Sequence, residues 1–354
     1  MTFVVPIRPI RPPQQFKKKN FIDKICLSPF VSVEISLYGQ VSLCGCYHWM
    51  PAKIGNIYEQ SLQDMLGSPL AVQIRQSIID GTYIFCNEST CGVIRNNLLN
   101  DIDNLPDNVA WQIEHPSRFL MPKEIVLSGD LTCNLSCPSC RTKVIKLSDQ
   151  EQKMQMQYIE ILKNNIFSNP TDQDIAITVS TSGELFASDF LLSFLQQISL
   201  RNFPNLYLNL QTNGLLCEKN WHRLGDLQDR VKKITVTIDA AQSDTYQKLR
   251  RGGTWDQIMK AMSWLHVKKK QNNMKLHTRC VVQKENYLQL EDFYKLSKSF
   301  AADIVEYARI SNWNTMPLED FTEIDIWSPH HGLYDSAMLH LNRIKDLPDV
   351  VTWG

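Results

Sequence analysis

The stretch Leu131–Arg141, LTCNLSCPSCR, places three cysteines within eight residues at a C-x3-C-x2-C spacing. Three thiolates are an unusual number, because a closed zinc site takes four ligands and disulfides take cysteines in pairs. They can hold three irons of a [4Fe–4S] cluster and leave the fourth iron open to an exogenous ligand. The preceding segment, EIVLS at 124–128, reads as a strand. The cysteines therefore follow a strand of a predicted parallel sheet, where such folds place active sites.

The chain around this loop alternates strand-like and helical segments from about residue 123 onward. The strand-like runs are residues 124–128, 174–180, 206–211, 233–239, 276–283 and 303–310. Amphipathic stretches of helical period lie between them, as at 188–200 and 255–269. Alternation of this kind gives an α/β fold with a parallel sheet and right-handed crossovers. Six strands without a clear seventh and eighth predict a partial (β/α)6 TIM-like barrel.

The N-terminal third differs, because residues 1–120 carry five of the ten cysteines. A hairpin is predicted at 31–46, with its turn at Tyr38-Gly39, and a helix is predicted at 61–81. We therefore predict three regions along the chain. They are a small cysteine-rich α+β cluster-binding domain at 1–120, the barrel at 121–314, and a C-terminal tail at 315–354 that packs back on the domains.

Composition argues against two classes of partner. Lys+Arg and Asp+Glu both number 37, so no overall basic charge would draw the protein to nucleic acid or to an anionic membrane. No apolar segment approaches the ~20 residues of a membrane helix, and the start, MTFVVPIRPIRPP, lacks the apolar core of a signal peptide. We expect a cytoplasmic protein, in which thiols stay reduced and ten cysteines indicate metal binding or catalysis.

The loop at 131–141, directly after a first barrel strand, resembles the cluster-binding loop of the radical S-adenosylmethionine (SAM) enzymes. The resemblance implies that Cys133, Cys137 and Cys140 hold a [4Fe–4S] cluster whose open iron binds the amino and carboxylate groups of SAM. It also implies that one electron from the cluster cleaves SAM to a 5′-deoxyadenosyl radical, which abstracts hydrogen from a substrate. The alternative is a zinc knuckle with a distant fourth ligand, but zinc sites favour paired short spacings.

Segments further along resemble the same family in order and position. They are TSGELF (181–186), LQTNG (210–214) and VTIDAAQSDTYQKLRRGGTWDQI (236–258). The resemblance assigns Gly183 and Glu184 to the SAM amino group, where glycine allows close backbone approach and the carboxylate accepts charged hydrogen bonds. Further candidates for SAM contacts are Ser139, Asn213, Thr237 and Arg309.

Three of these candidates depart from the family pattern or allow a second role. Ser139 departs from the family, which usually has an aromatic residue there, near the adenine. Thr237 takes the place of a frequent serine near the SAM ribose. Arg309 could pair with the SAM carboxylate or form a surface ion pair.

The N-terminal cysteines form a second pattern. Cys26, Gly39 and Cys44 follow a C-x12-G-x4-C spacing, which resembles the opening of the SPASM and twitch domains that hold auxiliary iron–sulfur clusters in radical SAM enzymes. A hairpin that turns at Gly39 would bring Cys44 back toward Cys26. Cys86 and Cys91 follow a predicted helix, and four thiolates complete one [4Fe–4S] cluster.

The predicted auxiliary ligands are therefore Cys26, Cys44, Cys86 and Cys91, and Cys46 could substitute for a neighbour. A structural zinc site of the same four cysteines is the alternative. These domains usually follow the barrel, whereas here the motif precedes it. Five cysteines are too few for two fully ligated clusters, so one auxiliary cluster is expected. Without an open iron, it would transfer electrons or support the fold.

Two further cysteines are candidates for catalysis. Cys217 follows the TNG segment, and Cys280 lies within the fifth predicted strand. Packing is the default role for a buried cysteine. The alternative is a hydrogen-atom donor that quenches a substrate radical, as epimerases of the family need.

The function expected from the sequence is oxidation or epimerisation of a small molecule or carbohydrate, with flavodoxin or ferredoxin as the reducing partner. The alternative substrate is a ribosomal peptide, modified by crosslinking or epimerisation. The small molecule is favoured because the cluster domain fills the N-terminal region where peptide maturases often carry a leader-binding domain. A third hypothesis is a non-catalytic iron–sulfur electron carrier.

Overall fold

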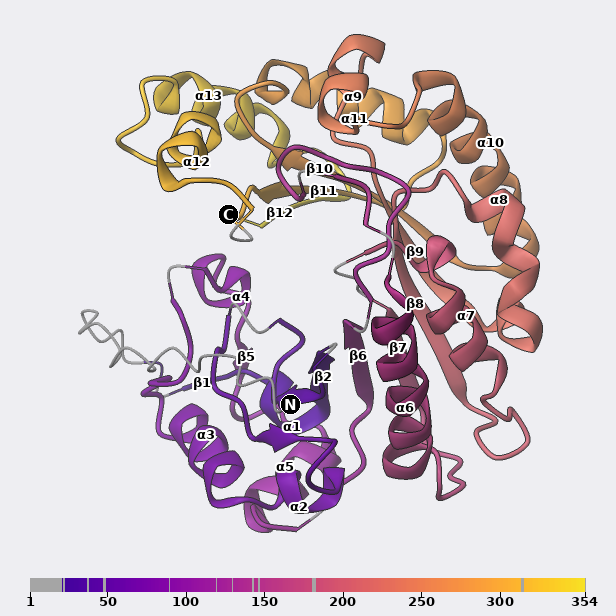
Figure 1. Cartoon of the computed structure of the whole chain (residues 1–354). Coiled ribbons are helices and arrows are strands. Elements are labelled where there is room, and N and C mark those ends of the chain that lie inside the picture. Colours follow the sequence, from indigo (N-terminus) through magenta and orange to yellow (C-terminus); the bar gives the residue numbers. More distant parts are fainter. Residues whose placement is uncertain are drawn as a thin grey trace.

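The computed structural model describes residues 21–353, apart from positions 22, 37, 47, 48, 89, 119, 129, 142, 146, 180–182, 313 and 314. The described elements include a ten-stranded sheet in the order β12-β11-β10-β9-β8-β7-β6-β2-β3-β4. A separate two-stranded sheet pairs β1 (Lys24–Ile25) with β5 (Asn100–Asp101). The large sheet curves strongly and carries most of its helices on the convex side (Figure 1).

The six predicted barrel strands are all present. They are β6 (Glu124–Ser128), β7 (Ile175–Val179), β8 (Leu206–Thr212), β9 (Val231–Thr237), β10 (Lys275–Val282) and β11 (Ile304–Arg309). Each lies parallel to the next. The helical segments between them are α6 (Asp149–Ile166), η1 (Leu185–Ala187), α7 (Asp189–Gln196), α8 (Cys217–Asn220), η2 (Trp221–Arg230), α9 (Ser243–Leu249), α10 (Trp255–Asn272), η3 (Tyr287–Gln289) and α11 (Leu290–Ser299). The predicted partial TIM-like barrel is confirmed.

Two further parallel strands extend the sheet beyond the six. Strand β2 (Ser32–Ser36) pairs with β6, and β12 (Val350–Trp353) pairs with β11. Strands β3 (Gln40–Ser42) and β4 (Gly55–Asn56) continue antiparallel from β2. Within the described part of the chain, β4 and β12 are the two ends of the sheet, which is not closed.

The predicted hairpin at 31–46 is present as β2 and β3. Its turn contains Gly39, whose φ of 73° lies in the left-handed region. A Cβ atom at Gly39 would also stand 2.4 Å from Cδ2 of Tyr58. The turn therefore needs glycine for both its backbone conformation and its packing.

The predicted helix at 61–81 is wrong as a single element, because two helices occupy this range. They are α2 (Leu62–Leu66) and α3 (Pro69–Ile79). Ser68 precedes a proline and has an extended ψ of 154°, as the proline ring favours. Its hydroxyl accepts a hydrogen bond from the amide of Ala71 and begins the second helix. The other N-terminal helices are α1 (Ser28–Val31), α4 (Gly92–Arg95) and α5 (Asp107–Glu114).

The C-terminal segment contains α12 (Leu318–Ile324) and α13 (Tyr334–Ile344) before it enters the sheet as β12. Its end also contacts the N-terminal region. The Trp353 and Trp49 ring centroids lie 6.4 Å apart, and the side-chain amide of Asn96 donates to the carbonyl of Thr352 at 2.9 Å. The tail thus packs on both parts of the molecule, while the domain boundaries themselves stay predictions.

The two faces of the sheet differ in polarity. In β8, Leu206, Leu208 and Leu210 are buried in the main core against the helices, while Asn209 and Gln211 alternate onto the opposite face. This inner face is polar in neighbouring strands too, and it is the face that a barrel ligand would meet.

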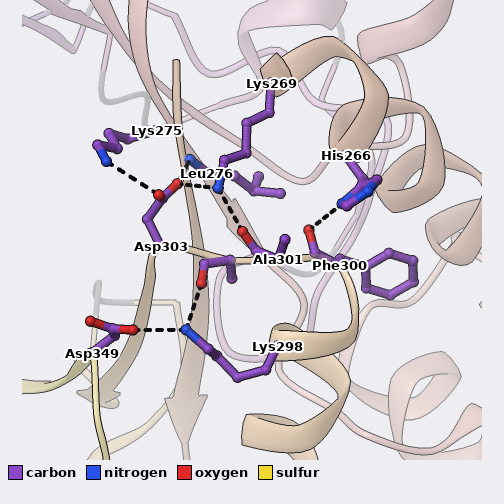
Figure 2. Close-up of polar contacts among 10 residues, drawn as sticks. His266, Lys269, Lys275, Leu276, Lys298, Phe300, Ala301, Asp303 and Asp349 are labelled. Carbon is purple, nitrogen blue, oxygen red and sulfur yellow. Dashed lines mark hydrogen bonds and ion pairs between the residues drawn. The ribbon is translucent and has the colours of Figure 1, made fainter. Parts of the chain in front are cut away.

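An ion-pair network ties together the starts of β10, β11 and β12 (Figure 2). The Asp303 carboxylate contacts Lys269 Nζ at 2.7 Å and Lys275 Nζ at 3.3 Å, and Lys298 pairs with Asp349 at 2.8 Å. Burial opposes ionisation of Asp303, but hydrogen bonds led by that from Lys269 outweigh it and lower its pKa. The network lies at the strand ends opposite the cysteine loop, the face of barrels that serves stability.

Candidate functional site

The three-cysteine loop follows β6 at the carboxyl ends of the parallel strands. Cys133 and Cys137 are buried and Cys140 is half-buried, packed with Leu135 and Leu215. The amide of Cys140 donates to the carbonyl of Cys137 at 2.9 Å, which closes a tight turn between two of the thiols. The fold therefore holds the three sulfurs in one compact, ordered loop.

Each sulfur of this loop has a hydrogen-bond donor beside it. The amide of Leu135 donates to Cys133 Sγ at 3.4 Å, and Arg141 Nη2 donates to Cys140 Sγ at 3.3 Å. The Arg250 guanidinium donates from Nη1 to Cys137 Sγ at 3.7 Å. Burial raises the pKa of the Cys133 thiol, a cost that a bound cation would remove by holding the thiolate. Three thiols with N–H donors directed at them fit the three protein ligands of a [4Fe–4S] cluster.

The Gly183-Glu184 pair packs directly on the cysteine loop. A Cβ atom at Gly183 would lie 2.4 Å from the carbonyl oxygen of Thr132 and 2.7 Å from that of Asp130, so no larger residue fits. The amide of Glu184 donates to the Thr132 carbonyl at 2.7 Å. The predicted SAM-binding pair and the predicted cluster loop are therefore brought together.

Glu184 is only 2% exposed, and its carboxylate accepts three hydrogen bonds. Its Oε1 accepts from the Thr212 hydroxyl at 2.6 Å and the Phe186 amide at 3.2 Å, and its Oε2 accepts from the Asn213 amide at 2.7 Å. Burial raises the pKa of this carboxyl, and the hydrogen bonds act in the opposite direction. A carboxylate has about four lone-pair sites, so it retains room for one more donor, such as an ammonium.

Two other predicted SAM contacts are Asn213, which touches the cysteine loop, and Ser139, which is part of it. The Asn213 side-chain amide donates to Asn134 Oδ1 at 2.8 Å and lies 3.9 Å from Cys133 Sγ. Ser139 is half-buried, and its carbonyl accepts from the Thr315 hydroxyl at 3.4 Å. Asn213 is thus in the site itself, and the adenine role of Ser139 stays a prediction.

Arg309 forms a two-pronged ion pair with Asp325, at 3.0 Å from Nε and 2.5 Å from Nη2. An ion pair is therefore present, but it is not the predicted surface pair, because the Asp325 side chain is only 6% exposed. A contact of Arg309 with SAM stays a prediction.

Sequence reasoning missed two polar side chains, Arg279 and Glu306, on the inner face of the barrel. They form a row with the predicted SAM contact Thr237, because the three are register partners across β9, β10 and β11. Arg279 donates from Nε (2.9 Å) and Nη2 (2.7 Å) to Glu306 Oε2, while His277 Nδ1 lies 2.9 Å from Oε1. The alternation in LHTRCVVQ, with His277 and Arg279 between buried residues, is the signal that could have found them.

Glu306 is expected to contribute strongly to stability. Burial alone would raise its pKa, but the hydrogen bonds from His277 and Arg279 and the Arg279 charge outweigh burial and lower it to about 2. A depressed acid pKa stabilises the fold above the unfolded value of about 4.3, and this contribution is lost as pH falls toward 2. Glu306→Gln should therefore lower the free energy of unfolding at pH 7 by about 3 kcal/mol.

Urea unfolding at several pH values tests this prediction. The difference between wild type and Glu306→Gln should be constant above about pH 5 and shrink below pH 4. Glu323→Gln is the matched control, because its ion pair with Lys284 is exposed and should be worth less than about 1 kcal/mol. Equal effects of the two substitutions at pH 7 would contradict the prediction.

The N-terminal cysteines surround one small cavity. Four thiols line it: Cys26, Cys44, Cys86 and Cys91. Tyr83 and Trp49 also line it, and Cys46 is not among its described lining residues. Burial is the main cause that raises the pKa values of the four lining thiols, and charge on neighbouring thiols adds to this for Cys26, Cys44 and Cys86. Four buried thiols around one cavity suit a bound metal cluster, and they are the set predicted from the spacing.

Cys217 and Cys280 lie in the main core instead. Cys280 shares the helix-facing side of β10 with Leu276 and Val282, and Cys217 Sγ lies 3.6 Å from the Thr212 hydroxyl. Burial raises the pKa of both thiols well above the ordinary range. Their placement favours the packing interpretation over a hydrogen-atom donor.

Comparison with known proteins gives two family matches. The model of the radical SAM superfamily matches residues 131–297, and that of the iron–sulfur cluster-binding domain SPASM matches residues 26–92. The N-terminal position of the second match agrees with the order predicted from the cysteine spacings.

The chain is also similar to two curated proteins. One is GTP 3′,8-cyclase of Alkaliphilus metalliredigens (strain QYMF), 28% identical over 132 residues, or 37% of this chain and 39% of that protein. The other is the FeMo cofactor biosynthesis protein NifB of Methanocaldococcus jannaschii, 25% identical over 123 residues, or 33% of this chain and 40% of that protein. The similarity thus spans about two fifths of the length of these relatives.

Two solved structures are similar at lower identity. Streptococcus suis SuiB bound to the precursor peptide SuiA is 14% identical, with 94% of this chain and 73% of that chain covered and a TM-score of 0.42. A radical SAM methyltransferase from Sphaerobacter thermophilus is 15% identical, with 62% and 63% covered and a TM-score of 0.41.

None of the helices in the described part of the chain is both long and apolar enough to cross a lipid bilayer. The chain thus contains a radical SAM superfamily domain at residues 131–297 and, in front of it, a SPASM iron–sulfur cluster-binding domain at residues 26–92, and its cofactors are SAM and [4Fe–4S] clusters.

Proposed function

We propose that the chain is an enzyme that cleaves SAM reductively at the three-cysteine cluster and abstracts a hydrogen atom from a small polar molecule, such as a carbohydrate, which is then oxidised or epimerised. The observation that carries this proposal is the polar inner face of the barrel beside the cysteine loop. Thr237, Arg279 and Glu306 form one row across three adjacent strands of that face. Such a surface suits a ligand rich in hydroxyl groups more than an apolar one.

The proposed roles of the chain's own residues are binding and orientation. When bound, the cluster and SAM supply the one-electron chemistry of hydrogen-atom abstraction. Glu184 would accept a hydrogen bond from the SAM ammonium at its remaining lone-pair site. Arg279 uses Nε and Nη2 on Glu306, and its other N–H groups would donate to a substrate hydroxyl. The Glu306 ion pair fixes that guanidinium in place, so little side-chain entropy is lost on binding.

We assign the auxiliary cluster to Cys26, Cys44, Cys86 and Cys91. With four protein thiolates it would have no open iron, so its role would be electron transfer or support of the fold. In an oxidation, it would accept the electron that the substrate radical releases and pass it to an external acceptor. Flavodoxin or ferredoxin is the proposed electron donor to the SAM-binding cluster.

A ribosomal peptide is the second candidate substrate, and the position of β12 favours it. This strand is the last in the sheet, so an extended peptide could add beside it by main-chain hydrogen bonds. Its Thr352 carbonyl is already bonded to Asn96, which leaves less of the edge for such pairing. The small-molecule candidate therefore stays first.

Anaerobic reconstitution followed by incubation with dithionite and SAM tests the proposal. Mass spectrometry should detect 5′-deoxyadenosine, and a true substrate should increase its rate of formation. Pools of sugars and of peptides, added separately, distinguish the two candidate classes. An absence of 5′-deoxyadenosine with both clusters intact would favour the non-catalytic electron carrier instead.

A further inference from the structure

Arg250 is a buried cation beside the cysteine loop. It ends α9, and its side chain is only 12% exposed. Its Nη2 lies 2.8 Å from Asp239 Oδ2, and its Nη1 donates to Cys137 Sγ at 3.7 Å. A buried guanidinium is costly unless it is paired and hydrogen-bonded. Asp239 provides the pairing, and the Cys137 sulfur is a second acceptor.

Asp239 is itself held firmly. Its side chain is 5% exposed, and its Oδ1 accepts from the Val281 amide at 2.7 Å. The side-chain amide of Asn286 donates to its carbonyl at 2.8 Å. These bonds, made to the end of β10 and the loop after it, fix the carboxylate and through it the guanidinium of Arg250. The Nη1 group of Arg250 that donates to Cys137 is therefore held in position before any cofactor binds.

A second arginine, Arg141, donates a hydrogen bond to the sulfur of Cys140. Arg141 donates from Nη2 to Cys140 Sγ at 3.3 Å, while its Nη1 donates to the Leu131 carbonyl at 2.7 Å. Cys133, in contrast, has a neutral donor, the amide of Leu135. Two of the three candidate ligands are thus paired with a positive charge from outside the ligand set.

We propose that Arg250 and Arg141 raise the reduction potential of the SAM-binding cluster through charged hydrogen bonds to the thiolates of Cys137 and Cys140, with Asp239 positioning Arg250. Reduction brings one electron from the external reductant into the cluster, and no bond to the chain forms or breaks. A cation within hydrogen-bond distance of a ligand sulfur stabilises the added negative charge, and hydrogen bonds and net charge around the sulfurs set cluster potentials. This inference rests on the proposed function, because it takes the three cysteines as ligands.

Redox titration of the reconstituted holoprotein, followed by electron paramagnetic resonance, tests the inference. Addition of SAM should alter the signal of the SAM-binding cluster alone, which distinguishes it from the auxiliary cluster. Arg250→Gln should make reduction of that cluster at least tenfold less favourable, about 59 mV for a one-electron couple. Arg250→Lys should restore part of this loss. The auxiliary signal should titrate as in wild type.

Arg251→Gln is the matched control. Arg251 is the exposed neighbour of Arg250, and its Nε donates to the Ser136 hydroxyl at 3.2 Å. Its loss should change the reduction equilibrium less than twofold. Arg141→Gln is the second variant, and it decides the question if Arg250→Gln fails to retain the cluster. It should also make reduction less favourable.

The outcomes separate this inference from the proposed function. Iron content and 5′-deoxyadenosine formation by the wild type report on the proposed function. The shift in the midpoint potential of the SAM-binding cluster reports on the two arginines. The inference is overturned if Arg250→Gln, or Arg141→Gln where the first variant loses its cluster, titrates like wild type. It is also overturned if Arg250→Gln only weakens SAM binding, measured by SAM titration without reductant. An equal shift in the auxiliary signal would likewise reject a local effect.

Discussion

Replacing Cys133, Cys137 and Cys140 together by alanine is expected to abolish 5′-deoxyadenosine formation and to lower the iron content from about eight to about four per chain. The three thiols lie in one compact loop, and each has an N–H donor directed at its sulfur. Without them, no ligands remain for the SAM-binding cluster. The auxiliary cysteines line a separate cavity, so their cluster should survive.

Iron and sulfide assays, a zinc assay and mass spectrometry of the reaction check this expectation. A complementary variant with Cys26, Cys44, Cys86 and Cys91 replaced by alanine should also retain about four irons. Its remaining signal should still respond to SAM. Cys217→Ala serves as a control for loss of a buried thiol outside both sites, and it should retain about eight irons.

Two outcomes would contradict the assignment. Eight irons in the triple variant would mean that other residues hold the SAM-binding cluster. Four irons together with one zinc in the wild type would mean that the N-terminal cysteines form the zinc site that the sequence left open as an alternative. A Cys46→Ala variant tests whether Cys46 is a ligand. It should leave the iron content unchanged if Cys46 lies outside the ligand set.

The barrel could be predicted because each of its six strands has a local signal. A run such as EIVLS or DIAITVS is apolar, short and followed by a helical period, so alternation of strand and helix is visible along the chain. Strands β2 and β12 were not counted as barrel strands. The first lies in a hairpin, and its parallel pairing with β6 joins segments about 90 residues apart. The second has only four residues, near the end of a segment without a clear period.

The site could be predicted where spacing carries the chemistry, and not where the fold alone makes the contact. Cysteine spacings predicted the ligand loop and the four thiols that line the auxiliary cavity. The contact of Arg250 with Cys137 joins residues 113 positions apart, so local pattern could not reveal it. The face of β10 on which Cys280 lies could be predicted from the sequence. Leu276 and Val282 share its side of the strand, and this side is the more apolar one.

Glu184→Gln is expected to raise the dissociation constant for SAM at least tenfold, which is about 1.4 kcal/mol of binding free energy. The ionised carboxylate accepts three hydrogen bonds on its two oxygens, from Thr212, Phe186 and Asn213. Glutamine has one carbonyl oxygen and an NH2 group, which can only donate. In either orientation the NH2 group would face an N–H or O–H donor of the chain. The substitution also removes the negative charge that would attract the SAM ammonium.

The same substitution should lower the free energy of unfolding by about 1–3 kcal/mol, because a buried donor loses its acceptor. SAM binding is measured anaerobically by titration against the signal of the SAM-binding cluster, and stability is measured by urea unfolding of the same preparation. Glu218→Gln is the matched control, since Glu218 lies in the segment after β8 and pairs with Lys260 on the surface. It should leave both quantities near wild type.

The two measurements together separate a role in binding from a role in folding. A Glu184→Gln protein that is less stable but binds SAM with wild-type affinity would mean that Glu184 only joins the loops after β7 and β8. Weaker binding in a protein that retains both clusters would place the carboxylate at the SAM ammonium. This second result is expected, because three of about four lone-pair sites of the carboxylate are used and the Glu184 amide bonds to Thr132 in the loop that carries Cys133.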